Sequence, residues 1–134
     1  TEEDIPYPRN FYSLTKLLGE FVVKCSGLSK WLIIRTNFTS REVWPHQKAF
    51  KDRYGTYLFA DDLAKAIKTV ISSKLTGIAH ICGDEKISMF ELARITTPMI
   101  SPMTLSEYNG PPLPMDMSLR STRVNAFRIS KKMG

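Results

Sequence analysis

The chain has 134 residues, of which 43% are hydrophobic and 24% are charged, a composition typical of one soluble globular domain. No apolar run approaches the roughly 20 residues that a membrane-spanning helix needs, and the chain does not begin with a basic-then-apolar signal segment. The net charge of +6 is spread along the sequence and has no aromatic-backed basic run except near the end, so it gives little support to nucleic-acid binding.

The cysteines and the basic residues near the C-terminus allow two further predictions. Cys25 and Cys82 form no paired motif and lie in apolar surroundings, so we expect reduced thiols in the core of a cytosolic protein. The basic residues between positions 120 and 132 are either a solvated tail or a source of attraction for a phosphate-bearing small molecule.

The first predicted helix covers residues 11–25 and follows an acidic loop in which Pro6 and Pro8 prevent regular structure. Tyr12 and Lys16 lie four residues apart on this helix, so they share one face and are one turn from each other. They lie at the edge of a broad stripe of apolar side chains that we expect to be buried. The stripe consists of Leu14, Leu17, Leu18, Phe21, Val22 and Cys25.

A tyrosine held beside a lysine is a candidate proton-transfer pair. A lysine ammonium about 5 Å from a phenol oxygen stabilises the phenolate by about 3 kcal/mol when the effective dielectric constant is about 20. The alternative is an exposed pair without a chemical role, because any helix places some tyrosine four residues before some lysine.

The rest of the chain alternates between strands and helices, which predicts an α/β fold. Strands are expected over residues 31–36, 56–60 and 78–82, and a short basic helix is expected over residues 46–53. Asp61 is expected to cap a helix over residues 62–73. Ser88 and Glu91 fit a capping box for a later helix that stops before Pro98, and residues 101–114 are expected to form a loop. The inward side chains of the 62–73 helix are expected to be Leu63, Ala66, Ile67, Val70 and Ile71.

Four segments, taken in order, resemble the extended short-chain dehydrogenase/reductases, and most closely their dTDP-4-dehydrorhamnose reductase-like branch of nucleotide-sugar enzymes. An acidic, proline-bearing loop leads into Tyr12-x-x-x-Lys16, followed by Gly19-Glu20. LIIRT at 32–36 is similar to the strand after that helix. FADDLAKAI at 59–67 is similar to a strand that runs into an Asp-Asp-Leu-Ala helix, and GIAHICG at 77–83 is similar to the next strand and turn.

The resemblance implies the C-terminal part of a Rossmann-type parallel sheet together with a small substrate-binding α/β lobe. Residues 1–36 and 56–82 would belong to the NAD(P)-binding domain, and residues 37–55 and 83–134 to the substrate-binding lobe. The seven glycines are scattered, and no Gly-rich phosphate loop can be assembled from them. We therefore expect the N-terminal cofactor-binding half to be absent from this chain. The chain would then expose an apolar sheet edge and helix face, through which a homodimer could form.

The activity implied by the resemblance is an NAD(P)H-dependent reduction of a nucleotide-linked 4-keto-6-deoxysugar in the cytoplasm, with NAD or NADP as cofactor. Tyr12 would donate a proton to the carbonyl oxygen and contact the cofactor. Lys16 would support that step and hydrogen-bond the nicotinamide ribose. The chain alone is expected to be inactive, because both cofactor and carbonyl must be positioned.

Four further residues are candidate ligand contacts. Arg35 and Thr36 come at the carboxyl end of a strand, where open α/β sheets place ligands, so both are candidates for cofactor binding. A salt bridge that closes the strand end is the alternative for Arg35. Asn37 and Arg120 are candidates for substrate binding. Arg120 belongs to the stretch 115–122, which is loosely similar to a late segment of the family. The family would have an acidic or small residue where this chain has Arg120.

Other functions stay open from the sequence. Epimerases and dehydratases of the same family keep the Tyr/Lys pair. The regulatory subunit of methionine adenosyltransferase resembles the same reductases and acts as a binding partner, so a non-catalytic interaction subunit is a second class. His46 and His80 have no partners at metal-ligand spacing, and we expect no metal site.

Overall fold

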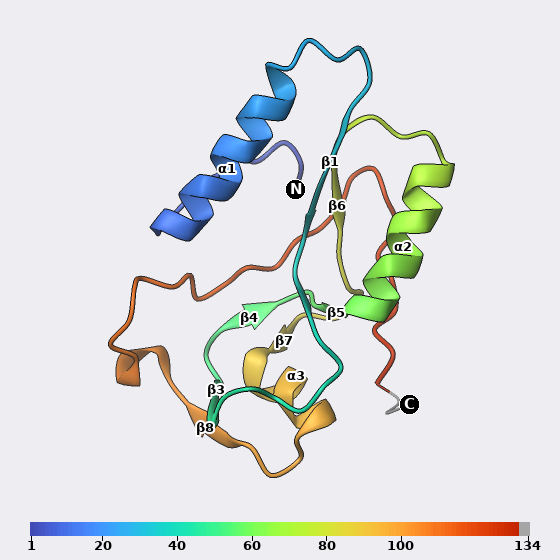
Figure 1. Cartoon of the computed structure of the whole chain (residues 1–134). Coiled ribbons are helices and arrows are strands. Elements are labelled where there is room, and N and C mark those ends of the chain that lie inside the picture. Colours follow the sequence, from blue (N-terminus) through green and yellow to red (C-terminus); the bar gives the residue numbers. More distant parts are fainter. Residues whose placement is uncertain (132–134) are drawn as a thin grey trace.

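The computed structural model describes residues 1–131, and its upper part is a strand pair between two helices. Helix α1 (Phe11–Lys24) lies on one side of strands β1 (Leu32–Thr36) and β6 (Gly77–Ile81), and helix α2 (Ala60–Ser72) lies on the other (Figure 1). The two strands run parallel, with Leu32 opposite Gly77 and Thr36 opposite Ile81. The α/β class and the predicted parallel strands are therefore confirmed.

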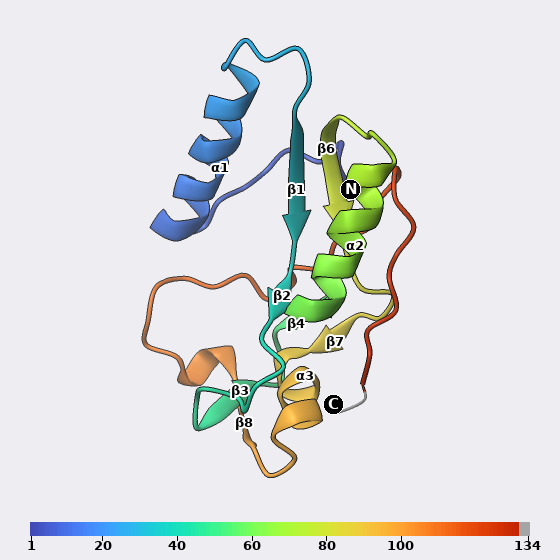
Figure 2. The same ribbon diagram turned by 45° about the vertical axis from the view of Figure 1, so that its right-hand side comes forward.

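Helix α1 begins where the sequence predicts, because Asn10 caps it by accepting a hydrogen bond from the Ser13 amide at 2.8 Å. The expected burial of its apolar stripe is wrong, since no residue of α1 is buried. Phe21 and Val22 remain 65% and 68% exposed because little of the chain packs on their side of the helix. Figure 2 shows that the strand pair separates α1 from α2. The apolar side chains of α1 are exposed, which is the exposed helix face predicted for a chain without the N-terminal half.

The core beside β1 and β6 is built by α2. Leu63, Ala66 and Val70 are buried on its inner face and pack with Leu58 and Ile81, as the helical spacing predicts. Ile71 was expected to face inward as well, but it is exposed because it lies on the next face of the helix.

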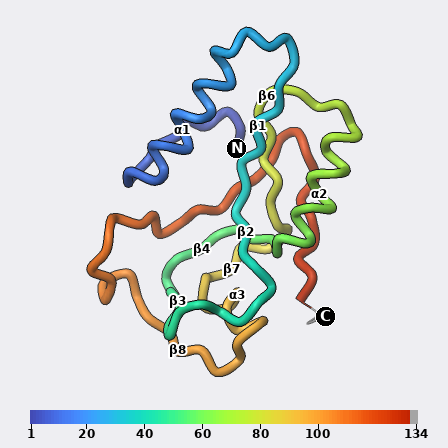
Figure 3. Tube along the Cα trace, viewed as in Figure 1, coloured from blue at the N-terminus to red at the C-terminus, as the bar shows by residue number. Residues whose placement is uncertain are grey.

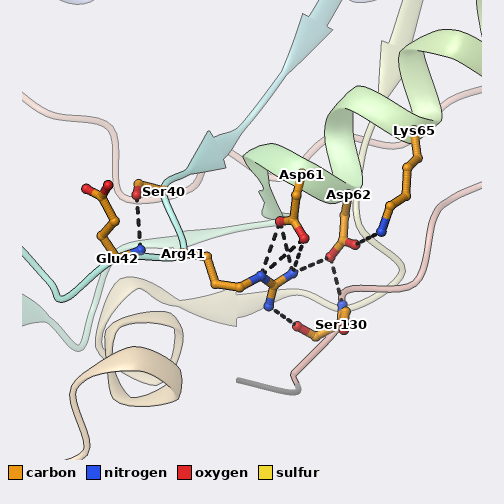
Figure 4. Close-up of polar contacts among 7 residues, drawn as sticks. All are labelled: Ser40, Arg41, Glu42, Asp61, Asp62, Lys65 and Ser130. Carbon is orange, nitrogen blue, oxygen red and sulfur yellow. Dashed lines mark hydrogen bonds and ion pairs between the residues drawn. The ribbon is translucent and has the colours of Figure 1, made fainter. Parts of the chain in front are cut away.

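The start of α2 differs from the prediction, because Phe59 occupies the N-cap position and Asp61 and Asp62 lie in the first turn. Both carboxylates bind the Arg41 guanidinium, with Nη2 3.0 Å from Asp61 Oδ1 and 2.9 Å from Asp62 Oδ2 (Figure 4). Arg41 also donates to the Ser130 carbonyl at 2.6 Å. These acidic residues therefore stabilise the helix start through its positive end and through Arg41 rather than as caps.

The lower part of the molecule contains short strand pairs and the helix α3 (Met89–Thr96) (Figure 1). Strand β3 (Lys48–Phe50) pairs in parallel with β8 (Ser101–Met103), and β4 (Tyr54–Gly55) pairs antiparallel with β7 (Ile87–Ser88). Strand β2 (Phe38–Thr39) pairs with β5 (Leu58–Phe59), and a 3-10 turn, η1, covers Leu105–Glu107.

Two predictions for this part are wrong. The basic helix over 46–53 is replaced by β3, and the loop over 101–114 contains β8 and η1. Each strand is stabilised by a partner that is distant in sequence, which local patterns do not show. The capping box is confirmed: the Glu91 amide donates to Ser88 Oγ and the Ser88 amide donates to Glu91 Oε2. A second core forms around α3, consisting of Tyr57, Phe59, Leu92 and Ile129.

The segment after η1 connects the two parts of the molecule. It runs from the lower strands up past β6 and then down again beside α2 (Figure 3). The Tyr54 amide donates to the Met115 carbonyl at 2.8 Å, and the Phe127 amide donates to the Cys82 carbonyl at 2.9 Å.

Residues 132–134 of the predicted substrate-binding lobe, Lys132 among them, lie outside the described residues. Both thiols are free, but only Cys82 is buried, so the core location expected for Cys25 is wrong.

Candidate functional site

The candidate catalytic pair lies on the first two turns of α1. Tyr12 is 69% exposed, and the Lys16 ammonium lies 5.2 Å from the centre of the Tyr12 ring. Because Asn10 fixes the start of the helix, the two side chains lie one turn apart on the same face. This is the arrangement that the sequence predicts for the pair.

Tyr12 and Lys16 both line an open cavity of about 500 Å³ between α1, the end of β1 and the segment after η1. Three other residues proposed from the sequence, Arg35, Thr36 and Asn37, line the same cavity. The structure thus brings five of the six predicted site residues together. The volume falls within the range of about 300–1,000 Å³ that is common for small-molecule sites.

Arg35 forms the salt bridge that was the alternative to cofactor binding. Its Nε and Nη2 donate to the two oxygens of Glu20 at 2.7 and 2.8 Å, a two-bond geometry that only arginine provides. The hydrogen bond from Arg35 lowers the pKa of Glu20, although partial burial opposes it. Arg35 therefore joins β1 to α1 and holds the helix that carries Tyr12.

Thr36 and Asn37 have different surroundings. Thr36 Oγ1 is buried and finds no hydrogen-bond partner among residues 1–131. Asn37 donates from Nδ2 to the Met117 carbonyl at 2.6 Å, and its own carbonyl accepts from the Leu58 amide. Asn37 therefore positions the segment after η1 at the edge of the cavity.

Arg120 is the one predicted site residue that does not line this cavity. Its backbone carbonyl lies 3.2 Å from His80 Nδ1, and its side chain is exposed beside a different depression. Residues 116–119, from the same stretch, do line the cavity. The stretch 115–122 thus reaches the candidate site through the residues before Arg120.

His80 is a site residue that the sequence did not reveal. It lies on β6 opposite Arg35, is only 2% exposed and lines the cavity. Its Nε2 has no hydrogen-bond partner within residues 1–131. Burial lowers the pKa of the His80 imidazole, so the ring is neutral near pH 7. An apolar strand with one histidine was the only signal in the sequence.

Glu2 holds the N-terminal segment beside this histidine. One carboxylate oxygen accepts from the His80 amide at 2.9 Å and from the Ser121 hydroxyl, and the other accepts from the Thr122 amide at 3.0 Å. Burial opposes ionisation, but these hydrogen bonds outweigh it and lower the pKa of Glu2 to about 2. Glu2 thereby ties the chain start to β6 and to residues 121–122.

The residues around the cavity include polar and charged side chains of the kind that contact polar ligands. Thr36 Oγ1 and His80 Nε2 are buried and have no hydrogen-bond partner among residues 1–131, and both residues line the cavity together with Lys16. Within residues 1–131 no group of three His, Cys, Asp or Glu side chains could hold a metal ion. In that same part of the chain no helix is long and apolar enough to cross a bilayer.

No protein-family model and no curated protein sequence matches this chain, but solved structures do. A hypothetical dTDP-4-dehydrorhamnose reductase from Sulfolobus tokodaii is 34% identical, with a TM-score of 0.72 over 92% of this chain and 50% of that one. The dTDP-4-dehydrorhamnose reductase from Yersinia enterocolitica is 26% identical, with a TM-score of 0.73 over 90% of this chain and 50% of that one. The Bacillus anthracis enzyme in complex with NADP is 21% identical, with a TM-score of 0.76 over the same shares of the two chains.

The chain thus spans about half the length of the reductases that it matches. Over that half it has their Rossmann-type α/β fold, so the resemblance inferred from the sequence is confirmed.

Proposed function

We propose that this chain is part of an NAD(P)H-dependent reductase that acts on the carbonyl group of a nucleotide-linked 4-keto-6-deoxysugar. The observation that carries the proposal is the joint placement of Tyr12 and Lys16 on the cavity that Arg35, Thr36 and Asn37 also line. The resemblance to dTDP-4-dehydrorhamnose reductases supports the substrate class, and the NADP complex of one of them supports the cofactor class.

In this proposal Tyr12 donates its hydroxyl proton to the carbonyl oxygen of the sugar. The nearby Lys16 ammonium, 5.2 Å from the ring centre, stabilises the phenolate that remains. The bound nicotinamide would supply the hydride. Arg35 acts indirectly, because its ion pair with Glu20 fixes the distance between α1 and β1 and so the position of Tyr12.

The same proposal requires residues beyond these 134. No Gly-rich loop is present in the chain to bind the cofactor diphosphate through backbone amides. We therefore expect the 134 residues alone to be inactive, and the activity to belong to the protein as its gene encodes it.

The test is oxidation of NADPH or NADH by the encoded protein in the presence of a dTDP-linked 4-keto-6-deoxysugar. Tyr12→Phe should lower kcat by about 10²–10⁴-fold, with a smaller change in KM. Lys16→Met should also lower kcat. Tyr54→Phe is the matched control, because Tyr54 lies outside the cavity, and it should leave the rate unchanged.

Other outcomes would replace this proposal with one of its alternatives. A converted sugar without net consumption of NAD(P)H would indicate an epimerase or a dehydratase. Binding of the sugar nucleotide with no conversion, in wild type and Tyr12→Phe alike, would indicate a non-catalytic subunit. Full turnover by Tyr12→Phe would refute the role of Tyr12.

A further inference from the structure

The lower part of the molecule contains a second cavity, of about 690 Å³, formed around β3, β8 and the segment after η1. None of its lining residues is shared with the Tyr12–Lys16 cavity. Its walls are largely aromatic and apolar, and Phe50 and Tyr108 pack edge to face with ring centres 5.5 Å apart. The residues that matter below are Trp44, Phe50, Arg53, Met89 and Tyr108.

Arg53 is the unusual member of this lining, because its charge is partly buried without a counter-ion. Within residues 1–131 it makes no ion pair with a carboxylate; its Nε donates to the Pro114 carbonyl at 3.1 Å. Its other two contacts are to sulfur, with Nη1 3.4 Å from Met89 Sδ and Nη2 2.9 Å from Met117 Sδ. Thioethers are weak acceptors, so they compensate a buried guanidinium poorly.

The charged side chains that line the cavity are both positive. Lys48 lines it together with Arg53, and no aspartate or glutamate among residues 1–131 does, although the Lys48 ammonium lies 3.8 Å from Glu107 outside the cavity. Burial lowers the pKa of Arg53, which is the effect expected of a cation placed away from water with no anion beside it. A positive, partly dry site with aromatic walls matches a ligand that carries both a negative charge and a flat ring.

We propose that this cavity binds an aromatic oxyanion, with its phosphate or carboxylate group on Arg53 and its ring against Trp44, Phe50 and Tyr108. The guanidinium has five N–H donors and uses one on a carbonyl and two on sulfur, so donors remain for the oxyanion. The ligand supplies the counter-charge that the chain lacks there. The site is independent of the proposed reductase activity and is tested by binding alone.

The experiment titrates four probes into the full chain carrying Trp31→Phe, which leaves Trp44 as the single fluorescent reporter. The probes are dTMP, thymidine, inorganic phosphate and benzoate, and calorimetry confirms each affinity. We expect dTMP or benzoate to change the Trp44 emission. Thymidine and inorganic phosphate, which each lack one half of the chemistry, should bind about ten-fold more weakly or less. A preference for dTMP identifies a nucleotide as the source of the oxyanion, and a preference for benzoate identifies an aromatic carboxylic acid.

Arg53→Met removes the charge while keeping a long apolar side chain beside the two methionines, and it should weaken binding about ten-fold or more. Arg94→Met is the matched control, because it removes one exposed positive charge from α3 outside the cavity. Arg53→Lys keeps the charge without the planar guanidinium and should bind the probe with intermediate affinity. It also provides the test if Arg53→Met does not fold. Failure of both dTMP and benzoate to bind more tightly than thymidine and inorganic phosphate, unchanged binding by Arg53→Met, or no binding of any probe at about 1 mM would each overturn the proposal.

Discussion

Arg35 and Glu20 are joined by two parallel hydrogen bonds that tie strand β1 to helix α1. Their side chains are only 18% and 15% exposed, so the pair is shielded more than a typical surface ion pair. It is also a polar link between the strand pair and the helix that carries Tyr12. The stability of this junction therefore bears on the proposed activity as well as on the fold.

We predict that Glu20→Gln lowers the free energy of unfolding by about 2 kcal/mol, because it leaves a partly buried guanidinium without its anion. Arg35→Lys should cost less, since it keeps one charged contact. Lys24→Met is the control: Lys24 also approaches Glu20, at 3.7 Å, but it is more exposed, and its loss should cost about 0.5 kcal/mol or less. Chemical unfolding followed by circular dichroism measures all three, and equal effects of Glu20→Gln and Lys24→Met would contradict the prediction.

The lowered pKa of Glu2 predicts how the stability of the fold changes at acidic pH. The folded value is about 2 and the ordinary value is 4.5, so the ionised form is favoured by folding. Its stabilisation is complete above about pH 4.5 and is lost as the pH falls toward 2. Unfolding measured from pH 7 to pH 2 should show Glu2→Gln less stable than wild type at neutral pH, with the difference vanishing at the acid end. Glu42→Gln, which changes an exposed carboxylate, should follow the wild-type curve; a constant gap between Glu2→Gln and wild type would contradict the assignment.

The capping box of α3 gives a third prediction. Ser88 is buried, and its hydroxyl accepts from the Glu91 amide at 3.1 Å. Ser88→Ala should lower the free energy of unfolding by about 1 kcal/mol, because one amide at the helix start loses its acceptor. Ser72→Ala, at an exposed position of α2, should be close to neutral. Thermal unfolding of the two variants compares them directly, and matching midpoints would show that the box adds no stability.

Two of the three α-helix starts, which depend on neighbouring residues, could be predicted from the sequence, and that of α2 could not. The start of α1 depends on Asn10 and Ser13, and the start of α3 depends on Ser88 and Glu91, all within one turn. Strand β3 could not be predicted, because its backbone partners are residues 101–103, which a pattern over residues 46–53 does not contain. Residues that look helical alone become a strand when such a partner is present.

The residues of the candidate site also fall into those that the sequence could reveal and those that it could not. Tyr12 and Lys16 could be proposed from their spacing on one helix, and Arg35 from its place at the carboxyl end of a strand; all three line the cavity. His80 and Glu2 could not, because their roles depend on the register between β1 and β6 and on the docking of the N-terminal segment. Arg120 does not line the cavity, and its backbone carbonyl lies 3.2 Å from His80 Nδ1, a contact that the sequence alone could not show.

The exposed face of α1 leads to the last prediction. Leu18, Phe21 and Val22 are each more than half exposed and form one apolar surface on the helix. Such a surface is unfavourable in water and promotes association with any apolar partner, including a second copy of the chain. Size-exclusion chromatography with light scattering should show the mass of the 134-residue chain rising with concentration.

A charge placed on this face should reverse that behaviour. Phe21→Glu should shift the chain toward the monomer at every concentration without lowering its unfolding midpoint, because Phe21 contributes little to the core of the isolated chain. Ile71→Glu is the matched control, since Ile71 is comparably exposed, but on α2, and its change should leave association unaltered. A wild-type chain that stays monomeric at high concentration, or an equal response to both substitutions, would show that α1 is not the associating surface.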